Sequence, residues 1–367
     1  MSTPAYLRYH DGLEQKQENE DTIIDSVVAS MMRMNQRVFD KHRHAKRDAH
    51  AKSHGVLVGH VTVYDNLPPH LAQGVFAKPA TYPVVLRLST ALGDIHSDKV
   101  PMPRGMAIKM LGVHGRQFLP QRQQAQATTQ DLLLVNYPVI AFGHAAAYLQ
   151  AQKLLEKHMD DPDITKRIMA ALASGGSKAL HALGISSPAI DTLGLPNTHI
   201  LGETFFSMAA VRYGDFVAKL CAAPMSGNVR ALTGQLIDKD AGDSALRDLV
   251  VAFFKDQGAE YELRAQLCTG TEQMPIEDAS VDWPQQLSPY QPVARLTIPP
   301  QDAYSPARRV FADDVLSFNP WHCIEEHRPL GSIMRARIKA YEASSAFRHQ
   351  MNAQPRIEID DIGQVPE

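Results

Sequence analysis

The chain has 367 residues, of which 44% are hydrophobic, and a formal net charge of −3, which allows a large buried core. This nearly neutral balance argues against a nucleic-acid-binding protein. The three cysteines, Cys221, Cys268 and Cys323, are scattered without CxxC spacing, which predicts reduced thiols and no disulfide framework. The polar N-terminus has no apolar signal region, and no apolar run reaches about 18 residues. We therefore expect a cytoplasmic protein that does not span a membrane.

The predicted elements begin with a polar arm over residues 1–20, followed by a helix over 21–40 with Asp21 as its N-cap. A basic, histidine-rich run over 41–55 comes next, and 116–130 has the composition of an exposed loop. β-Branched and apolar residues predict strands at 56–64, 83–90, 105–111, 131–136, 202–212, 215–221, 260–268 and 293–299. Helical spacing predicts helices at 143–158, 163–175, 243–257 and 330–350, and 300–332 is expected to be irregular.

The order of these elements predicts the fold class. Strands in runs, interrupted by a helical block, indicate an α+β protein with an antiparallel sheet. About eight such strands can close into a barrel, which leaves no exposed edge. We therefore predict an eight-stranded antiparallel β-barrel with peripheral helices. Residues 1–40 form an N-terminal arm and helix in this scheme, and residues 41–367 form the barrel unit with a helical insertion and a C-terminal helix.

The predicted C-terminal helix carries a tyrosine between two arginines. Arg337 precedes Tyr341 by one turn and Arg348 follows it by two, so the three lie on or near one face. A cation within about 4–6 Å favours the ionised form of a group, and tyrosinate is an axial ligand of haem iron. The same spacing is compatible with a surface arginine that covers a partly buried tyrosine.

Two further positions have side chains suited to chemistry. His50 lies in the basic run, where it is either an acid–base group or part of a solvated segment. Its neighbouring histidines have no acidic or cysteine partner at ligand spacing, so a metal site is not predicted there. Arg87 and Ser89 are two residues apart on a strand and share a face. An arginine pointing inward from an apolar strand needs an anion or an aspartate partner.

Taken in order, five segments resemble the signature segments of the haem catalase family. They are RDAHAK from Arg47, RLST from Arg87, RGMAIKM from Arg104, FNP from Phe318 and RIKAY from Arg337. The resemblance covers about residues 40–145 and 290–350. It implies an eight-stranded barrel with haem b, iron protoporphyrin IX, between the barrel and the helices. Because the chain ends soon after the last segment, it resembles a minimal version of the family.

The resemblance also implies roles for individual residues. His50 is similar to the distal acid–base histidine, and Ser89 to the hydroxyl that orients it. Tyr341 is similar to the proximal iron ligand, and Arg337 to the arginine that keeps this ligand ionised. The implied haem contacts are Arg47, Arg87 and Arg348 at the propionates and Phe142 on the porphyrin ring. Thr129 falls at the position of the family's distal asparagine.

The implied activity is decomposition of hydrogen peroxide through a ferryl intermediate. Thr129 in place of an amide favours the alternative of a haem peroxidase, or of an enzyme acting on organic and fatty-acid hydroperoxides. A non-enzymatic haem-binding stress protein is a further alternative. Related proteins form dimers or tetramers with exchanged arms, so we expect a homo-oligomer, and the absence of a nucleotide fingerprint argues against bound NADPH.

Overall fold

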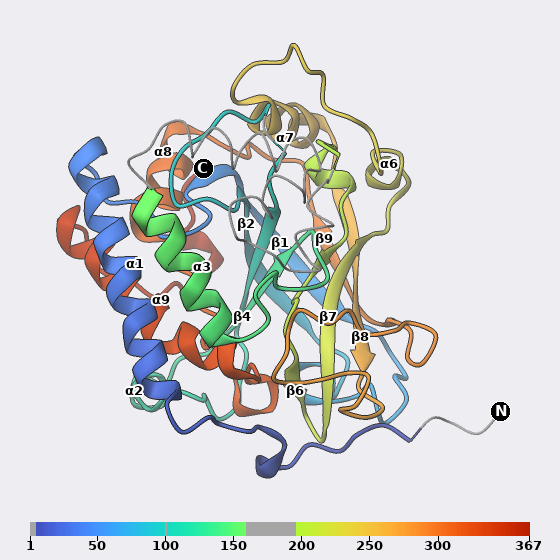
Figure 1. The fold of residues 1–367 in the computed structure, drawn as a ribbon. Coiled ribbons are helices and arrows are strands. Elements are labelled where there is room, and N and C mark those ends of the chain that lie inside the picture. The colour runs from blue at the N-terminus through green and yellow to red at the C-terminus, as the bar shows by residue number, and fades with distance from the viewer. Residues whose placement is uncertain (1–4, 100, 159–195) are drawn as a thin grey trace.

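The computed structural model describes residues 5–99, 101–158 and 196–367 and is built around a β-barrel (Figure 1). Its strands are β1 (Lys52–Val63), β2 (Thr81–Thr90), β3 (Arg104–Leu111), β4 (Thr129–Val135), β5 (Phe205–Phe206), β6 (Val211–Tyr213), β7 (Phe216–Pro224), β8 (Ala259–Leu267) and β9 (Gln291–Ile298). Eight of them form an antiparallel ring in the order β5-β4-β3-β2-β1-β9-β8-β7, which β5 closes by pairing with both β4 and β7. The ninth strand, β6, pairs with β7. The predicted eight-stranded antiparallel barrel is confirmed.

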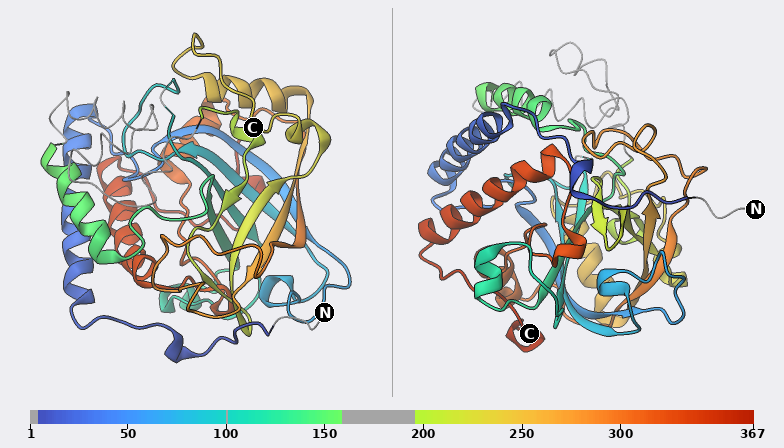
Figure 2. Two further views of the ribbon diagram at one scale, coloured as in Figure 1. Left: turned by 45° about the vertical axis from the view of Figure 1, so that its right-hand side comes forward. Right: turned by 90° about the horizontal axis from the view of Figure 1, so that it is seen from below.

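Helices cover one side and one end of the barrel. They are α1 (Glu20–His42), α2 (Pro120–Gln124), α3 (Ala145–His158), α6 (Gly227–Arg230), α7 (Ala245–Asp256), α8 (Pro306–Val310) and α9 (Ser332–Met351), with a π-helical turn at Phe311–Val315 and 3-10 turns at Asp11–Leu13, Gly74–Phe76, Ile200–Gly202, Glu325–His327 and Ile362–Gln364. The helices α1, α3 and α9 contact one another along one side of the barrel, whereas α6 and α7 lie at one end (Figures 1 and 2).

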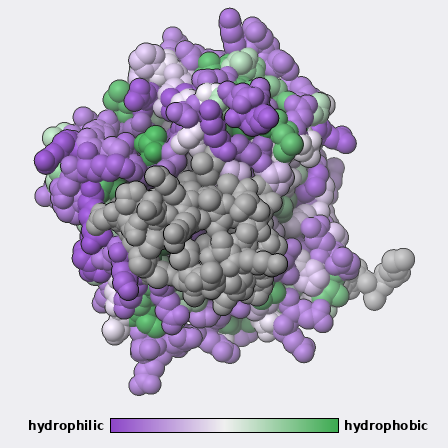
Figure 3. Space-filling view, turned by 45° about the horizontal axis from the view of Figure 1, so that its top comes forward, coloured by the Kyte–Doolittle hydropathy of each residue, from purple (hydrophilic) through white to green (hydrophobic). Residues whose placement is uncertain are grey.

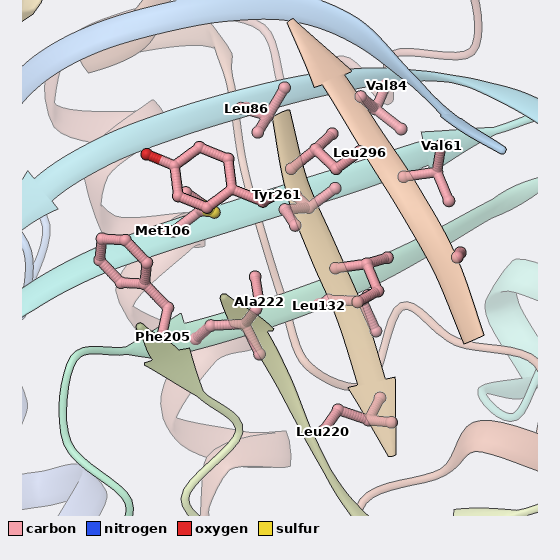
Figure 4. Close-up of a cluster of buried hydrophobic side chains, with 14 of the residues drawn as sticks. Val61, Val84, Leu86, Met106, Leu132, Phe205, Leu220, Ala222, Tyr261 and Leu296 are labelled. Atoms are coloured by element: carbon pink, nitrogen blue, oxygen red, sulfur yellow. The ribbon is translucent and has the colours of Figure 1, made fainter. Parts of the chain in front are cut away.

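Alternate residues of each strand fill the barrel interior. Leu86 from β2, Met106 from β3 and Leu132 from β4 meet Tyr261 and Leu296 from the opposite wall in one buried cluster (Figure 4). Full burial of such a side chain stabilises the fold by about 1.5–3 kcal/mol relative to exposure. The residues between them on β2, β3 and β4 point the other way, out of the barrel.

The first predicted helix is confirmed, but its predicted cap is wrong. The helix begins at Glu20, with Asn19 at the N-cap position and no side-chain cap hydrogen bond. Asp21 already lies in the first turn, where its carboxylate accepts a hydrogen bond from Lys16 Nζ at 2.9 Å. An acidic side chain in this turn is also favoured by the helix dipole, so composition alone does not locate the cap.

Three other predictions need correction. The range 116–130 is not an exposed loop, because it contains α2 and the buried side chains of Gln117 and Arg122. The strand predicted over 202–212 is divided into the short strands β5 and β6. The irregular range 300–332 contains α8 and the π-helical turn. The remaining strands and helices are confirmed within a few residues, apart from the helix predicted at 163–175, which lies outside the described residues.

The surface and the thiols show no unusual feature. Cys221, Cys268 and Cys323 are buried and unpaired. No helix in the described ranges is long and apolar enough to cross a bilayer. Figure 3 shows mostly hydrophilic side chains on the described part of one face, with hydrophobic side chains in small separate groups.

An arginine in the first turn of α9 attaches this helix to the rest of the protein. The Arg335 guanidinium contacts Glu14 of the N-terminal arm at 2.5 Å and Glu20 of α1 at 2.6 Å. It also contacts Glu277, from the loop after β8, at 2.9 Å. The N-terminal region, the loop after β8 and α9 therefore meet at the Arg335 side chain. This contact fixes the start of the helix that carries Tyr341.

Substitution Arg335→Met should lower the free energy of unfolding by roughly 3 kcal/mol, because it leaves one buried and two partly exposed carboxylates without their cation. The Glu20 side chain is only 2% exposed. Urea unfolding followed by circular dichroism measures this effect. The control is Lys339→Met, also on α9. It removes an exposed ion pair between Lys339 and Asp25 of α1 and should leave the unfolding midpoint unchanged. Equal midpoints for both variants would contradict the anchoring role.

Candidate functional site

A cavity lies between the barrel wall and α9. It encloses about 890 Å3 of space, which includes a part open to solvent. Seven of the nine residues assigned to the site from the sequence line it: Arg47, His50, Arg87, Ser89, Arg337, Tyr341 and Arg348. They come from the segment before β1, from β2 and from α9, so the fold brings together residues almost 300 positions apart.

Strand register creates the wall of this cavity. Two rows of paired residues cross the outer face of β2, β3 and β4: Arg87, Ala107 and Leu133 in one row, and Ser89, Gly105 and Val135 in the other. The prediction that Arg87 and Ser89 share a face is confirmed. Arg87 is buried, and it points out of the barrel toward the cavity, because the positions on β2 that face the barrel interior belong to apolar core residues.

Three arginine side chains, Arg47, Arg87 and Arg348, gather at one end of the cavity. Most of their hydrogen bonds go to backbone carbonyl groups: from Arg47 to Leu316, from Arg348 to Asp313, Asp314 and Leu316 at 2.7, 2.9 and 3.4 Å, and from Arg87 to His50 at 2.8 Å. Arg348 also donates to the hydroxyl of Ser317 at 2.8 Å. Within the described residues, none of the three guanidinium groups forms an ion pair with a carboxylate. Carbonyl groups orient a guanidinium without neutralising its charge.

The three positive charges destabilise one another. Burial, and then Arg47 and Arg87, lower the pKa of Arg348 to about 8. Burial, and then Arg47, lower the pKa of Arg87 to about 9. The Nε atom of Arg87 is buried and has no hydrogen-bond partner. Because buried cations require counter-charges, this end of the cavity is suited to an anionic ligand.

His50 is held at the edge of the cavity by its backbone and by two neighbours. Its φ of 56° is left-handed, and its Nδ1 lies 3.0 Å from Ser89 Oγ. A Cβ at Gly105 would lie 2.6 Å from the imidazole, so only glycine leaves room for the ring. Burial, followed by Arg87, Arg337 and Arg47, lowers the pKa of His50 to about 3. The imidazole is therefore neutral and able to accept a proton.

Tyr341 and Arg337 line the cavity from α9. Burial raises the pKa of Tyr341, and the positive charge of Arg337 opposes this rise. The expected direction of the arginine's effect is confirmed, but the arginine does not by itself ionise the phenol. The negative charge of Asp48 also raises the pKa of Tyr341. A phenolate at this position needs a second cation, such as a metal ion bound to its oxygen.

Among the other residues that line the cavity, for which no role was predicted, are Asp48, Phe318 and Met208. Asp48 accepts a hydrogen bond from Ser344 Oγ at 2.7 Å, and burial raises the pKa of its carboxyl group. The only feature of the sequence that could have pointed to Asp48 is that it is an acidic residue within a basic run. Phe318 belongs to the FNP segment, but no role had been assigned to it. Met208 lies between β5 and β6, where no pattern distinguished it.

Two predicted site residues do not line the cavity. Thr129 is buried at the start of β4, where its hydroxyl donates a hydrogen bond to Glu358 at 3.0 Å. The end of β4 that reaches the cavity carries Val135, six residues further along the strand, so the predicted position of Thr129 near His50 is wrong. Phe142 is half-buried outside the lining of the cavity.

The other histidines of the basic run have partners elsewhere. Their contacts are His42 with Asp94 at 2.7 Å, His44 with Asp314 at 2.8 Å and His54 with Thr90 at 2.7 Å. Over the described ranges, no cluster of three or more histidine, cysteine, aspartate or glutamate side chains could hold a metal ion. A metal at the cavity would therefore have to be held by another kind of ligand, such as a phenol.

The comparisons with known proteins concern the fold. No protein-family model matches the chain, and no curated protein matches its sequence. The structure is similar to that of a fungal catalase, with 16% identity and a TM-score of 0.59 over 95% of this chain and 68% of that one. It is also similar to catalase A from Saccharomyces cerevisiae, with 16% identity and a TM-score of 0.57 over 98% of this chain and 72% of that one. The chain therefore has a catalase-like fold.

Substitution Gly105→Ala should displace the His50 ring, because the added Cβ would lie 2.6 Å from it and 2.9 Å from Ser89 Oγ. We expect the Nδ1–Oγ distance in a crystal structure of the variant to exceed 3.5 Å, while the fold is retained because the ring can move into the cavity. Gly227→Ala is the control, since its Cβ would meet no atom within 4 Å. An unchanged His50–Ser89 hydrogen bond in Gly105→Ala would contradict the role of the glycine.

Proposed function

We propose that the protein is a haem enzyme that reduces peroxides. The observation that carries this proposal is the meeting of three features in one cavity. They are a neutral histidine held by a serine, a tyrosine beside an arginine, and three arginines without carboxylate partners. The catalase-like fold supports the proposal, because the cavity lies against the same barrel that the chain shares with two catalases.

The residues of the cavity fit haem b. Protoporphyrin IX is a flat apolar ring with two carboxylates on one edge. The cavity offers an apolar wall that includes Ala107, Leu133 and Phe318. At one end it offers cations, among them the unpartnered Nε of Arg87. Arg47, Arg87 and Arg348 would bind the two propionates, and the phenolate oxygen of Tyr341 would hold the iron.

The side chains around the cavity supply the proton chemistry. Bound haem iron would supply the redox chemistry by binding the peroxide and accepting its oxidising equivalents. His50 is neutral, so its second ring nitrogen can take the proton from the peroxide while Ser89 fixes the ring. Positive charges near the ring disfavour the imidazolium. The ring therefore returns the proton readily to the departing oxygen, which leaves as water or an alcohol.

A peroxidase that uses organic hydroperoxides is a second candidate function. The cavity is lined by no asparagine or glutamine among the described residues, so it lacks a side-chain amide that could polarise a second hydrogen peroxide molecule. Such a site is suited to a reaction in which one peroxide molecule is reduced by a separate electron donor. The ratio of turnover with hydrogen peroxide to turnover with cumene hydroperoxide separates this candidate from a catalase.

Purified protein supplied with haem should show the absorption spectrum of a high-spin ferric haem ligated by tyrosinate. Tyr341→Phe should lose this spectrum, because the iron loses its anionic oxygen ligand. Tyr304→Phe, which removes a hydroxyl group outside the cavity, is the control and should keep the spectrum. A colourless wild-type preparation, or an unaltered spectrum in Tyr341→Phe, would exclude the proposed ligation.

Peroxide turnover should depend on neutral His50. His50→Ala should keep its haem spectrum and lose roughly 100-fold or more of kcat/KM, which is typical of an acid–base residue. In the wild type, kcat/KM should stay level from pH 7 to pH 5, because a group with a pKa of about 3 remains unprotonated over this range. A tenfold fall in kcat/KM between these pH values would indicate that the pKa of His50 is close to the usual histidine value of about 6.5. Normal haem binding with no turnover of any peroxide would instead support a haem-binding protein without activity.

A further inference from the structure

A second cavity lies behind the arginines of the candidate haem site. It encloses about 780 Å3, partly open to solvent, between the start of β1, the loop after β2, α7 and the segment from Tyr304 to Asp313. The two cavities share a wall. The carbonyl of Ala51 accepts a hydrogen bond from Arg87 at 3.3 Å, and the carbonyl of Asp313 accepts one from Arg348 at 2.7 Å. The second cavity therefore adjoins the end at which we place the haem propionates.

Cationic side chains with spare hydrogen-bonding capacity line this second cavity. The side chains of Lys46 and Arg309 make no hydrogen bond or ion pair with any described residue. Arg247 stacks its guanidinium 4.3 Å above the Tyr304 ring, and its buried Nε has no hydrogen-bond partner. Three cationic groups in one cavity thus retain donors that a ligand could use.

A buried hydroxyl group adds a further unused donor. Ser53, at the start of β1, is only 2% exposed, and its Oγ has no partner although it lines the cavity. The fourth cation of the lining, Lys52, is different, because the buried Asp98 carboxylate neutralises it at 2.7 Å. Within this cavity, the free donors therefore belong to Lys46, Arg247, Arg309 and Ser53.

The charge of the lining limits the charge of the ligand. Two carboxylates, Asp243 and Asp313, also line the cavity and partly offset the three cations. Asp243 already accepts a hydrogen bond from Ser97 at 2.6 Å. The small remaining positive charge suits a singly charged carboxylate better than a phosphate, which carries close to two negative charges at neutral pH.

We propose that this second cavity binds a small organic acid through its carboxylate, with Lys46, Arg247 and Arg309 as the cationic groups and the Ser53 hydroxyl as an added donor. The further assignment, that the bound acid is an electron donor, rests on the proposed function. A phenolic acid at this position would lie beside the haem edge. Two molecules of it, each giving one electron and one proton, would reduce one hydroperoxide to an alcohol and water and leave two phenoxyl radicals.

The test compares two donors that differ in the carboxylate. Ferulate is a methoxyphenol with an acidic side chain, and guaiacol is the same methoxyphenol without it. With the haem-loaded full chain, calorimetry measures ferulate binding, and cumene hydroperoxide starts the oxidation of either donor. The double variant Lys46→Gln, Arg309→Gln should weaken ferulate binding by about tenfold or more, since each lost charge removes a charge-assisted hydrogen bond. Its oxidation of guaiacol should be unchanged.

A control variant that loses the same charge outside the cavity shows whether the effect on ferulate binding is specific to the cavity. Lys255→Gln, Arg230→Gln removes two exposed cations that do not line the cavity, and it should bind ferulate like the wild type. Absent ferulate binding, or equal weakening in both double variants, would overturn the site. Ferulate binding that depends on Lys46 and Arg309 in a protein without peroxide turnover would support the site and refute the proposed function. Binding without ferulate oxidation, while guaiacol is oxidised, would overturn the donor role alone.

Discussion

The site depends on three clustered arginines, two of them buried, that form no ion pair with a carboxylate of the described residues. Arg47 and Arg348 are oriented by carbonyl groups from the π-helical turn and the residue after it. In this turn the amide of Leu316 bonds to the carbonyl of Phe311, five residues earlier. The wider loop leaves the intervening carbonyls free to accept from arginine, and such turns often occur at functional sites. The local backbone is thus shaped to present cations to a ligand.

The same face of the barrel shows that the chain can neutralise a buried cation. Lys109 on β3 lies on the cavity-facing side of the sheet, and its ammonium contacts Asp131 at 2.8 Å and Glu358 at 3.0 Å. That lysine has two carboxylates within hydrogen-bonding distance, whereas the three cavity arginines have none among the described residues. This contrast supports the proposal that the three arginines bind an anionic ligand.

Local spacing made part of this site predictable. Arg87 and Ser89 share a face because side chains alternate along a strand, and Arg337 lies near Tyr341 because it precedes it by one helical turn. These relations hold wherever the elements lie in space. Thr129 was misplaced because it was assigned from the resemblance alone, whereas its distance from His50 depends on how β4 pairs with β3. Asp48 was missed for a related reason, since its partner Ser344 comes from a helix almost 300 residues later.

The left-handed backbone at His50 connects the arginine cluster of the cavity with the imidazole. The carbonyl of this residue accepts its hydrogen bond from Arg87, one of the three cavity arginines. The same guanidinium therefore lines the cavity and holds the left-handed peptide unit of His50. A substitution of Arg87 would therefore act on two features at once: the charge of the cavity and the backbone that sets the position of the imidazole.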